Sequence, residues 1–184
     1  MFDEDIKIAD FGASHKAKSE QNPQGVNEEY DRENAKGNTL KAKTFGAQLA
    51  KELINNLDRF TAGEEESENT EIAIQRGILM TFAAIVCIEN QIASSVVSQI
   101  AENSFNAELQ MSVPQLYSAA SQSGALSFYY LAHRRGGEVD RRVGQTFAML
   151  CSHDGDSVYQ ELGEAIYCWF LSLASKRLRE AGIA

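Results

Sequence analysis

The sequence has almost no proline and shows no regular pairing of its cysteines. Pro23 and Pro114 are the two prolines among 184 residues, so long helices can form with few interruptions. The cysteines are Cys87, Cys151 and Cys168, which are odd in number, far apart and set in apolar stretches. No Cys-x-x-Cys or Cys/His spacing indicates a zinc site. We therefore predict reduced thiols and no bound metal or cofactor.

The sequence also lacks an excess of basic residues. Its formal net charge is −9, with a pI near 4.9. Nucleic-acid binding needs a basic surface, and so does docking on anionic membranes. The acidity lies mostly in the N-terminal part: residues 1–70 hold 15 acidic and nine basic side chains, against 11 and eight in residues 71–184. We expect no nucleic-acid partner and no membrane partner.

No hydrophobic run is long enough to span a bilayer. The longest run, Ile78 to Ile88, is broken by Thr81, whereas a spanning helix needs about 20 apolar residues. Residues 1–5 lack the basic and apolar parts of a secretory signal. These features predict a cytoplasmic protein in which the run 78–88 belongs to a core helix.

What the sequence does contain is helical periodicity from residue 39 onward. Apolar residues recur three and four positions apart, which is the spacing of one helix face. We expect five helices, over about 39–62, 70–106, 112–135, 139–150 and 157–181. Their short connections favour antiparallel neighbours. The predicted fold class is therefore all-α, with about five helices in an antiparallel bundle or helical array.

Local signals support the bounds of several of these helices. Pro114 suits the first turn of the third helix, where its missing N–H is not needed. Asp156 or Ser157 can cap the fifth helix, and Gly182 can end it. The second helix, with the broadest apolar face, is expected at the centre of the bundle with a kink near residues 103–104.

The third predicted helix combines large and small residues on one face. Small residues one turn apart would let another helix approach closely. The predicted buried face consists of Leu116, Tyr117, Ala120, Gly124, Ser127, Phe128 and Leu131.

Residues 1–38 lack helical periodicity. Gly, Asn, Ser, Glu and Lys are common there, and apolar residues are isolated. We predict an acidic, flexible N-terminal segment over residues 1–38, mobile or loosely packed on the fold, and a single helical domain over residues 39–184.

Glu89 lies where the helical period calls for an apolar side chain. A carboxylate in an apolar stripe must be paired, hydrogen-bonded or protonated, because an isolated buried charge is prohibitively unfavourable. Glu89 could be a pocket acid that meets a ligand. It could instead be a structural anchor bound by Tyr117, Tyr129, Tyr130 or an arginine, or it could lie at the edge of the stripe. The structural interpretations are favoured, and Glu89, Tyr117 and Tyr130 are the candidate ligand-binding residues.

Four arginines gather around Gly136-Gly137. Arg134, Arg135, Arg141 and Arg142 could form an anion site with the start of the fourth helix, where free N–H groups point outward. The alternative, which is the commoner arrangement, divides the four arginines. Arg134 and Arg135 would balance the negative end of the third helix dipole, and Arg141 and Arg142 would pair with Glu138 and nearby acids on a solvated surface.

No pattern in the sequence indicates catalysis. His15, His133 and His153 have no metal-ligating partner three or four residues away, and no nucleophile motif is present. We therefore predict a non-enzymatic protein that acts through protein–protein contacts or self-association. The alternative is a small-molecule-binding protein or small enzyme with a pocket between helices that contains Glu89.

Overall fold

The computed structural model describes residues 23–58 and 69–184, and these residues form eight α-helices with no β-strand among them. The all-α prediction is confirmed, whereas the count of about five helices is too low. The helices are α1 (Pro23–Ala35), α2 (Asn38–Asn55), α3 (Asn69–Gln91), α4 (Ser95–Ser112), α5 (Pro114–Gln122), α6 (Ala125–Arg134), α7 (Val139–Leu150) and α8 (Ser157–Ala181).

The predicted second helix is two helices, α3 and α4. The chain leaves the helical conformation at residues 92–94, where Ser94 adopts an extended backbone. The Ser94 side chain accepts a hydrogen bond from the Val97 N–H and caps α4, a role that serine fills well. The apolar stripe continues through the break because both helices bury residues there, so the periodicity hides it. The helix end expected near residue 106 is wrong, because α4 runs on to Ser112, and the kink near residues 103–104 stays a prediction.

The predicted third helix is also two helices, α5 and α6. Gly124 separates them with a φ of 70°, a left-handed conformation that glycine adopts without strain. The change of direction rotates α6 relative to α5, so their residues do not share one face. The close approach expected at Gly124 is wrong, since a β-carbon there would meet nothing within 4 Å. Close approaches occur instead between α2 and α4, at Gly46, and between α7 and α8, at Gly144.

Part of the predicted flexible segment is helical. α1 occupies residues 23–35, and its Glu33 is buried. Residues 1–22 lie outside the described residues, as do residues 59–62 at the end of the first predicted helix. The lack of helical structure expected over residues 1–38 is therefore wrong for residues 23–35, whereas the mobility or loose packing of this segment stays a prediction.

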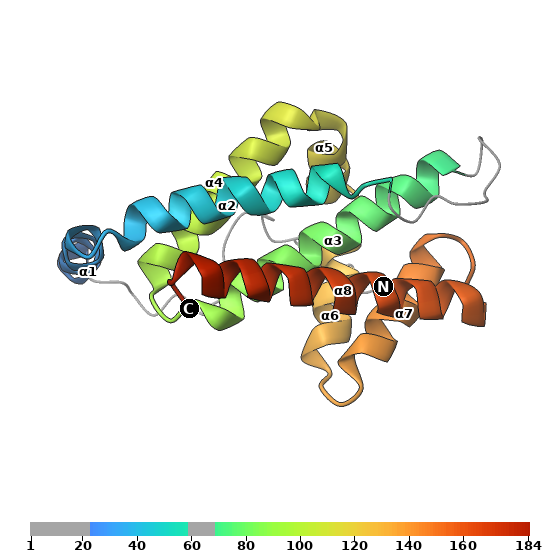
Figure 1. Cartoon of the computed structure of the whole chain (residues 1–184). Helices are drawn as coiled ribbons and strands as arrows, with labels where there is room; N and C mark the ends of the chain where they lie inside the picture. Colours follow the sequence, from blue (N-terminus) through green and yellow to red (C-terminus); the bar gives the residue numbers. More distant parts are fainter. Residues whose placement is uncertain (1–22, 59–68) are drawn as a thin grey trace, which may run out of the picture.

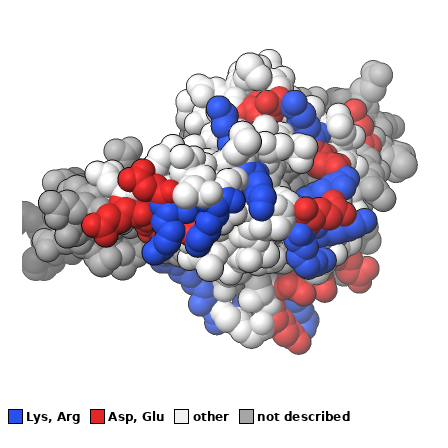
Figure 2. Space-filling model, turned by 60° about the vertical axis from the view of Figure 1, so that its left-hand side comes forward, with Lys and Arg blue, Asp and Glu red and all other residues white. Residues whose placement is uncertain are grey.

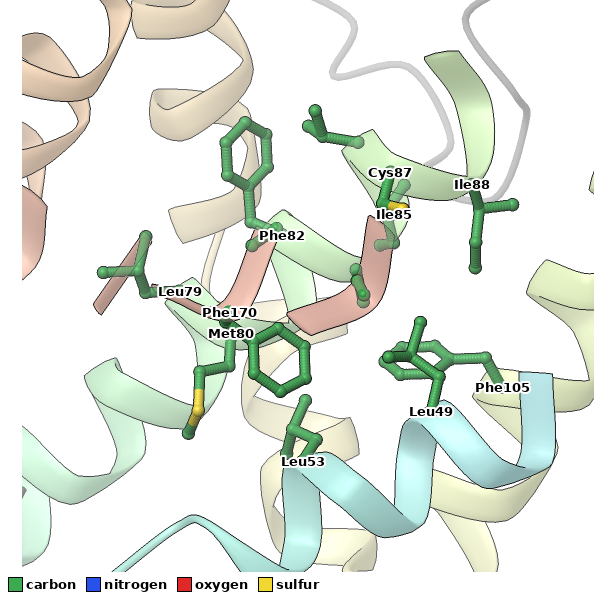
Figure 3. Close-up of a cluster of buried hydrophobic side chains, with 14 of the residues drawn as sticks. Leu49, Leu53, Leu79, Met80, Phe82, Ile85, Cys87, Ile88, Phe105 and Phe170 are labelled. Carbon is green, nitrogen blue, oxygen red and sulfur yellow. The ribbon is translucent and has the colours of Figure 1, made fainter. Parts of the chain in front are cut away.

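α3 is the central helix, as predicted. It contacts every other described helix except α1, and all residues from Arg76 to Ile88 are buried. In Figure 1, α8 crosses the molecule with α2 above it and α6 and α7 below it. Figure 3 shows side chains from several helices meeting in this core, among them Leu53 of α2, Phe105 of α4 and Phe170 of α8. Burial on all sides explains why residues 77–88 of α3 include no charged side chain.

By length and composition alone, α3 could also cross a membrane. The most apolar 18-residue window within Thr70–Gln91 has a mean hydropathy of 1.7, and 78% of that window is buried inside the fold. The core helix of a soluble protein has the same properties.

Candidate functional site

Helix α6 brings most of the candidate residues together. On its inner side, Tyr129 and Tyr130 pack on Phe82 of α3, with ring centroids 5.4 Å and 5.2 Å from the phenylalanine ring. Tyr129 stacks on Phe82, and Tyr130 meets it edge-on. These aromatic contacts fix the rotation of α6 against α3 and direct the hydroxyl of Tyr130 toward the end of α3.

Glu89 lies in the last turn of α3 and is half-buried. The hydroxyl of Tyr130 donates a hydrogen bond to its Oε2 over 3.4 Å. Tyr117 is far from this point, because its neighbour Leu116 packs at Gly77, twelve residues or about 18 Å earlier along α3. The structure therefore brings Glu89 and Tyr130 together and places Tyr117 elsewhere.

A second carboxylate, Glu102 of α4, lies near Glu89. Burial raises the pKa of Glu102 above its ordinary value, and the neighbouring charge of Glu89 raises it further. Burial also raises the pKa of Tyr130, and both carboxylates add to this effect. Tyr130 therefore stays protonated and acts as a donor. We call Glu89, Glu102 and Tyr130 the acidic corner; such a group can hold a shared proton or attract a small cation.

Tyr129, one residue away, has a different environment. It is 0% exposed, and its hydroxyl is enclosed with no hydrogen-bond partner. Burial raises the pKa of Tyr129 well above its ordinary value, with a smaller effect from Cys151. Burial disfavours the ionised form of this phenol and so makes it unsuited to act as a base; Tyr129 is a core residue that retains an unpaired polar atom.

The four arginines turn toward different neighbours. Arg141 pairs with Glu138 over 3.3 Å in an exposed ion pair. Arg134 lies near Tyr130, because its charge opposes the rise in the pKa of that residue. Arg142 lies against Gly137, with one guanidinium nitrogen, Nη1, enclosed and lacking a hydrogen-bond partner. Arg135 is exposed at the end of α6. The anion site at this turn stays a prediction.

The outer side of α6 was predicted wrongly. The prediction that Phe128 and Leu131 lie in the core is wrong, because they are 47% and 54% exposed. The cause is the break at Gly124, which turns α6 so that Tyr129 faces inward and Phe128 faces outward. Gly124 itself was the signal that could have revealed this, because a glycine between two short helical segments also marks a helix boundary.

Two of the surface hollows are formed by described residues. One lies between α2 and α8, where Arg177 is ion-paired with both Glu52 and Glu180. The other is shallow and runs along α5, from Pro114 to Ser123. Neither hollow includes a residue of the acidic corner. Charges on the face shown in Figure 2 are mixed, with basic and acidic side chains next to each other rather than in a continuous basic stripe.

No group of three or more His, Cys, Asp or Glu side chains in the described part of the chain is arranged to hold a metal ion. Two of the three histidines lie within this part, and both contact aromatic rings. His133 meets Phe82 edge-on, and His153 stacks on Tyr159 with ring centroids 3.7 Å apart.

Comparison of the chain with protein-family models, with curated proteins and with solved structures finds no match.

Proposed function

We propose that this chain is a non-enzymatic helical protein that acts through protein–protein contacts, and that the outer side of α6 is the contact surface. We call Phe128, Leu131 and Arg135 the α6 face; their spacing of three and four residues puts them on one side of the helix. The observation that carries the proposal is the exposure of Phe128 and Leu131, one turn apart.

Single exposed apolar residues are ordinary on protein surfaces, but a neighbouring pair is more informative. In the described part of the chain, the other large apolar side chains that stand exposed have no second one three or four positions away; they are Tyr30, Leu40, Ile74, Met111, Met149 and Val158. Aromatic and arginine side chains are enriched at interfaces and dominate their binding energy. Phe128 and Arg135 supply both types.

The charges near the α6 face favour an acidic partner. Arg134 and Arg135 end the helix, and an identical surface of a second copy would bring arginines toward arginines without an acid on α6 to compensate them. We therefore propose a different protein as the partner, one with acidic residues beside apolar ones. Cys87 and Cys168 have free thiols, which supports the further proposal of a cytoplasmic location.

The test uses two variants of the purified protein in which exposed apolar side chains are replaced by serine. It compares the partner proteins that each variant retains from a lysate of the source cells. In the first, Phe128→Ser is combined with Leu131→Ser; in the second, the control, Leu40→Ser changes a side chain that is 70% exposed on α2. Partners retained by the wild type should also be retained by the control and should be lost with the α6 variant. Loss of an aromatic hot spot weakens binding by about 2–4 kcal/mol. Recovery of the same proteins by the α6 variant would refute the proposal.

A second candidate function is binding of a small cationic ligand at the acidic corner. The raised pKa of Glu102 beside Glu89 supports it, because a cation near the two carboxylates would relieve their repulsion. Putrescine is a suitable probe, because its ammonium groups would attract both carboxylates. Side-chain NMR signals of Glu102 should shift with putrescine in the wild type and not in Glu89→Gln. Unchanged signals in the wild type would remove this candidate.

A further inference from the structure

Helix α1 is held to the fold by polar contacts rather than by apolar burial. Among residues 25–35, whose side chains the structure describes, Glu33 is the one buried side chain. Val26 is half-buried, and Tyr30 is 45% exposed. Most helices in proteins are stabilised by an apolar face packed on the core. Since α1 has almost none, it is expected to detach at a low free energy compared with the rest of the fold.

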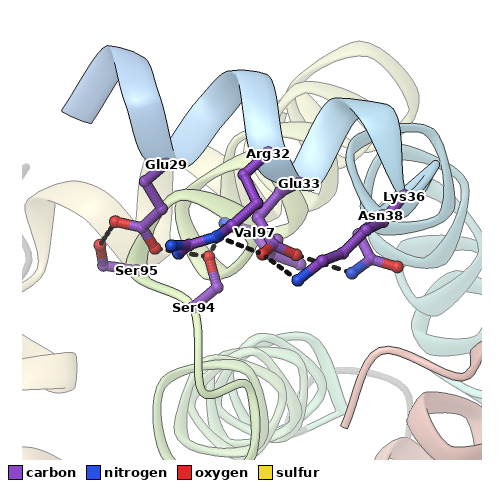
Figure 4. Close-up of polar contacts among 8 residues, drawn as sticks. All are labelled: Glu29, Arg32, Glu33, Lys36, Asn38, Ser94, Ser95 and Val97. Atoms are coloured by element: carbon purple, nitrogen blue, oxygen red, sulfur yellow. Dashed lines mark hydrogen bonds and ion pairs between the residues drawn. The ribbon is translucent and has the colours of Figure 1, made fainter. Parts of the chain in front are cut away.

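The contact that α1 makes with α4 is a carboxylate at a helix N-terminus. Glu29 accepts hydrogen bonds from the hydroxyls of Ser94 and Ser95 over 2.7 Å and 3.3 Å (Figure 4). Ser94 is also the cap of α4, because its Oγ accepts from the Val97 N–H. The positive end of the helix dipole favours a negative charge at this position. Ser94 and Ser95, which we call the Ser94–Ser95 corner, therefore form a binding site for a carboxylate. In the structure this site is filled by Glu29 of α1.

A sharp bend connects α1 to α2. Only Lys36 and Gly37 separate the two helices, and Gly37 has a φ of +75°. The Asn38 side chain donates to Glu33 over 2.7 Å. This hydrogen bond is the largest of the contacts that hold the pKa of Glu33 below its usual range. Thr39 donates to Asn34, also over 2.7 Å.

These two hydrogen bonds join side chains five residues apart, which lie on different sides of a straight helix. They therefore belong to the bent form alone. If Gly37 took the right-handed helical conformation, α1 and α2 would join into one helix from residue 23 to residue 55. α1 would then project about 20 Å from the body, given its 13 residues. The Ser94–Ser95 corner would be vacated at the same time.

We infer that α1 is an exchangeable arm and that its partner is a second copy of this chain, with Gly37 as the hinge. In the exchanged form, Glu29 of each copy occupies the Ser94–Ser95 corner of the other. A second copy fits this corner because it carries the same helix that fills the corner within one chain. The exchange is reciprocal, so it closes a two-fold pair and leaves no arm unbound. The α6 face takes no part in this contact, and the two proposals can fail separately.

The hinge can be tested by Gly37→Ala. A β-carbon on Gly37 would meet nothing within 4 Å, so the substitution acts through the backbone alone. Alanine disfavours the left-handed bend and favours a continuous helix, which should shift the balance toward the straight form by about tenfold or more. Gly155→Ala is the matched control, with a φ of +81° and equally open space in the loop before α8. Light scattering over a range of concentrations should detect a dimer for Gly37→Ala and a monomer for Gly155→Ala.

The occupant of the corner is tested by complementation in the Gly37→Ala protein. Adding Glu29→Ala removes the arm's carboxylate. Adding Ser94→Gly with Ser95→Ala removes the receiving hydroxyls, and α4 should keep its start because glycine is well tolerated at a helix N-cap. Each of these proteins alone should be monomeric, and mixing them should restore a dimer with one intact contact. Adding Glu28→Ala, an exposed neighbour on α1, should leave the Gly37→Ala dimer intact.

Three results would overturn the inference: a Gly37→Ala protein that is monomeric at all concentrations, a dimer that survives Glu29→Ala, or a mixture that stays monomeric. If Gly37→Ala did not fold, the same comparison would be made with the wild type held at high concentration. There, slow exchange should produce a dimer that the Glu29→Ala protein does not form, and a wild type without such a dimer would overturn the inference.

Discussion

The backbone of Gly46 in α2 lies directly against the carbonyl oxygen of Ala101 in α4, so that a β-carbon on Gly46 would overlap that oxygen. The same β-carbon would stand 3.0 Å from the backbone nitrogen of Phe105. Backbone atoms cannot move aside as a flexible side chain can. This contact therefore sets the separation of α2 and α4, the pair that carries α1 at one end.

Gly46→Ala should destabilise the protein by about 1–3 kcal/mol, because overpacking forces the two helices apart. Gly25→Ala is the matched control: Gly25 is also helical, in α1, and its β-carbon would meet nothing within 4 Å. The control should gain up to about 1 kcal/mol from helix propensity alone. Urea unfolding measures both free energies, and a Gly46→Ala protein as stable as the control would contradict the packing argument.

Tyr129→Phe should leave stability unchanged or raise it by about 1–3 kcal/mol, because it deletes a buried hydroxyl that has no hydrogen-bond partner. Tyr130→Phe is the contrasting variant, since Tyr130 donates to Glu89. It should lose about 0.5–1.5 kcal/mol. Thermal and urea unfolding of both variants test the difference, and a marked loss in Tyr129→Phe would indicate a partner for that hydroxyl.

The acidic corner should make stability depend on pH through Glu102. Its pKa in the folded protein is raised above the unfolded value of 4.5, so the folded state favours the protonated form. The unfavourable contribution is absent below pH 4.5 and grows as the pH rises through the folded pKa. Glu102→Gln should therefore be more stable than the wild type at about pH 7 and no more stable at about pH 4.

Urea unfolding at the two pH values measures this difference. The control is Glu161→Gln at an exposed position of α8, which should change stability little at either pH. A Glu102→Gln protein whose advantage was equal at both pH values would show that charge is not its cause.

Cys168 should react slowly although it is exposed. Burial of its sulfur, followed by the nearby Asp140 and Glu164 carboxylates, raises the pKa of this thiol from 9.0 to about 11. The reactive species is the thiolate, so a rise of about two pKa units predicts alkylation roughly a hundredfold slower than for an ordinary thiol at about pH 8. Asp140→Asn should accelerate the reaction, which iodoacetamide labelling followed by mass spectrometry can measure. An unchanged rate in that variant would remove Asp140 from the explanation.

The sequence by itself determined the helical class and the ends of the last two helices. The predicted bounds 139–150 and 157–181 match α7 and α8. Asp156 caps α8 through the Val158 N–H, and Gly182 ends it with a φ of 66°. These signals are local: a cap or a left-handed glycine acts within one turn of the chain, so neighbouring residues suffice to predict it.

Only the tertiary structure decided where the two long apolar segments break and which side of α6 is exposed. The spacing of apolar residues continues across Ser94 and Gly124, because the helices on both sides of each break bury residues. This spacing alone therefore does not reveal that the chain changes direction there. The hydrogen bond between Tyr130 and Glu89 joins residues 41 positions apart, and the bond between Glu29 and Ser94 joins residues 65 apart. Such pairs depend on how the helices pack. The helical period places Glu89 inside the apolar stripe. In the structure α3 ends two residues after Glu89, and the side chain is half-buried in the acidic corner.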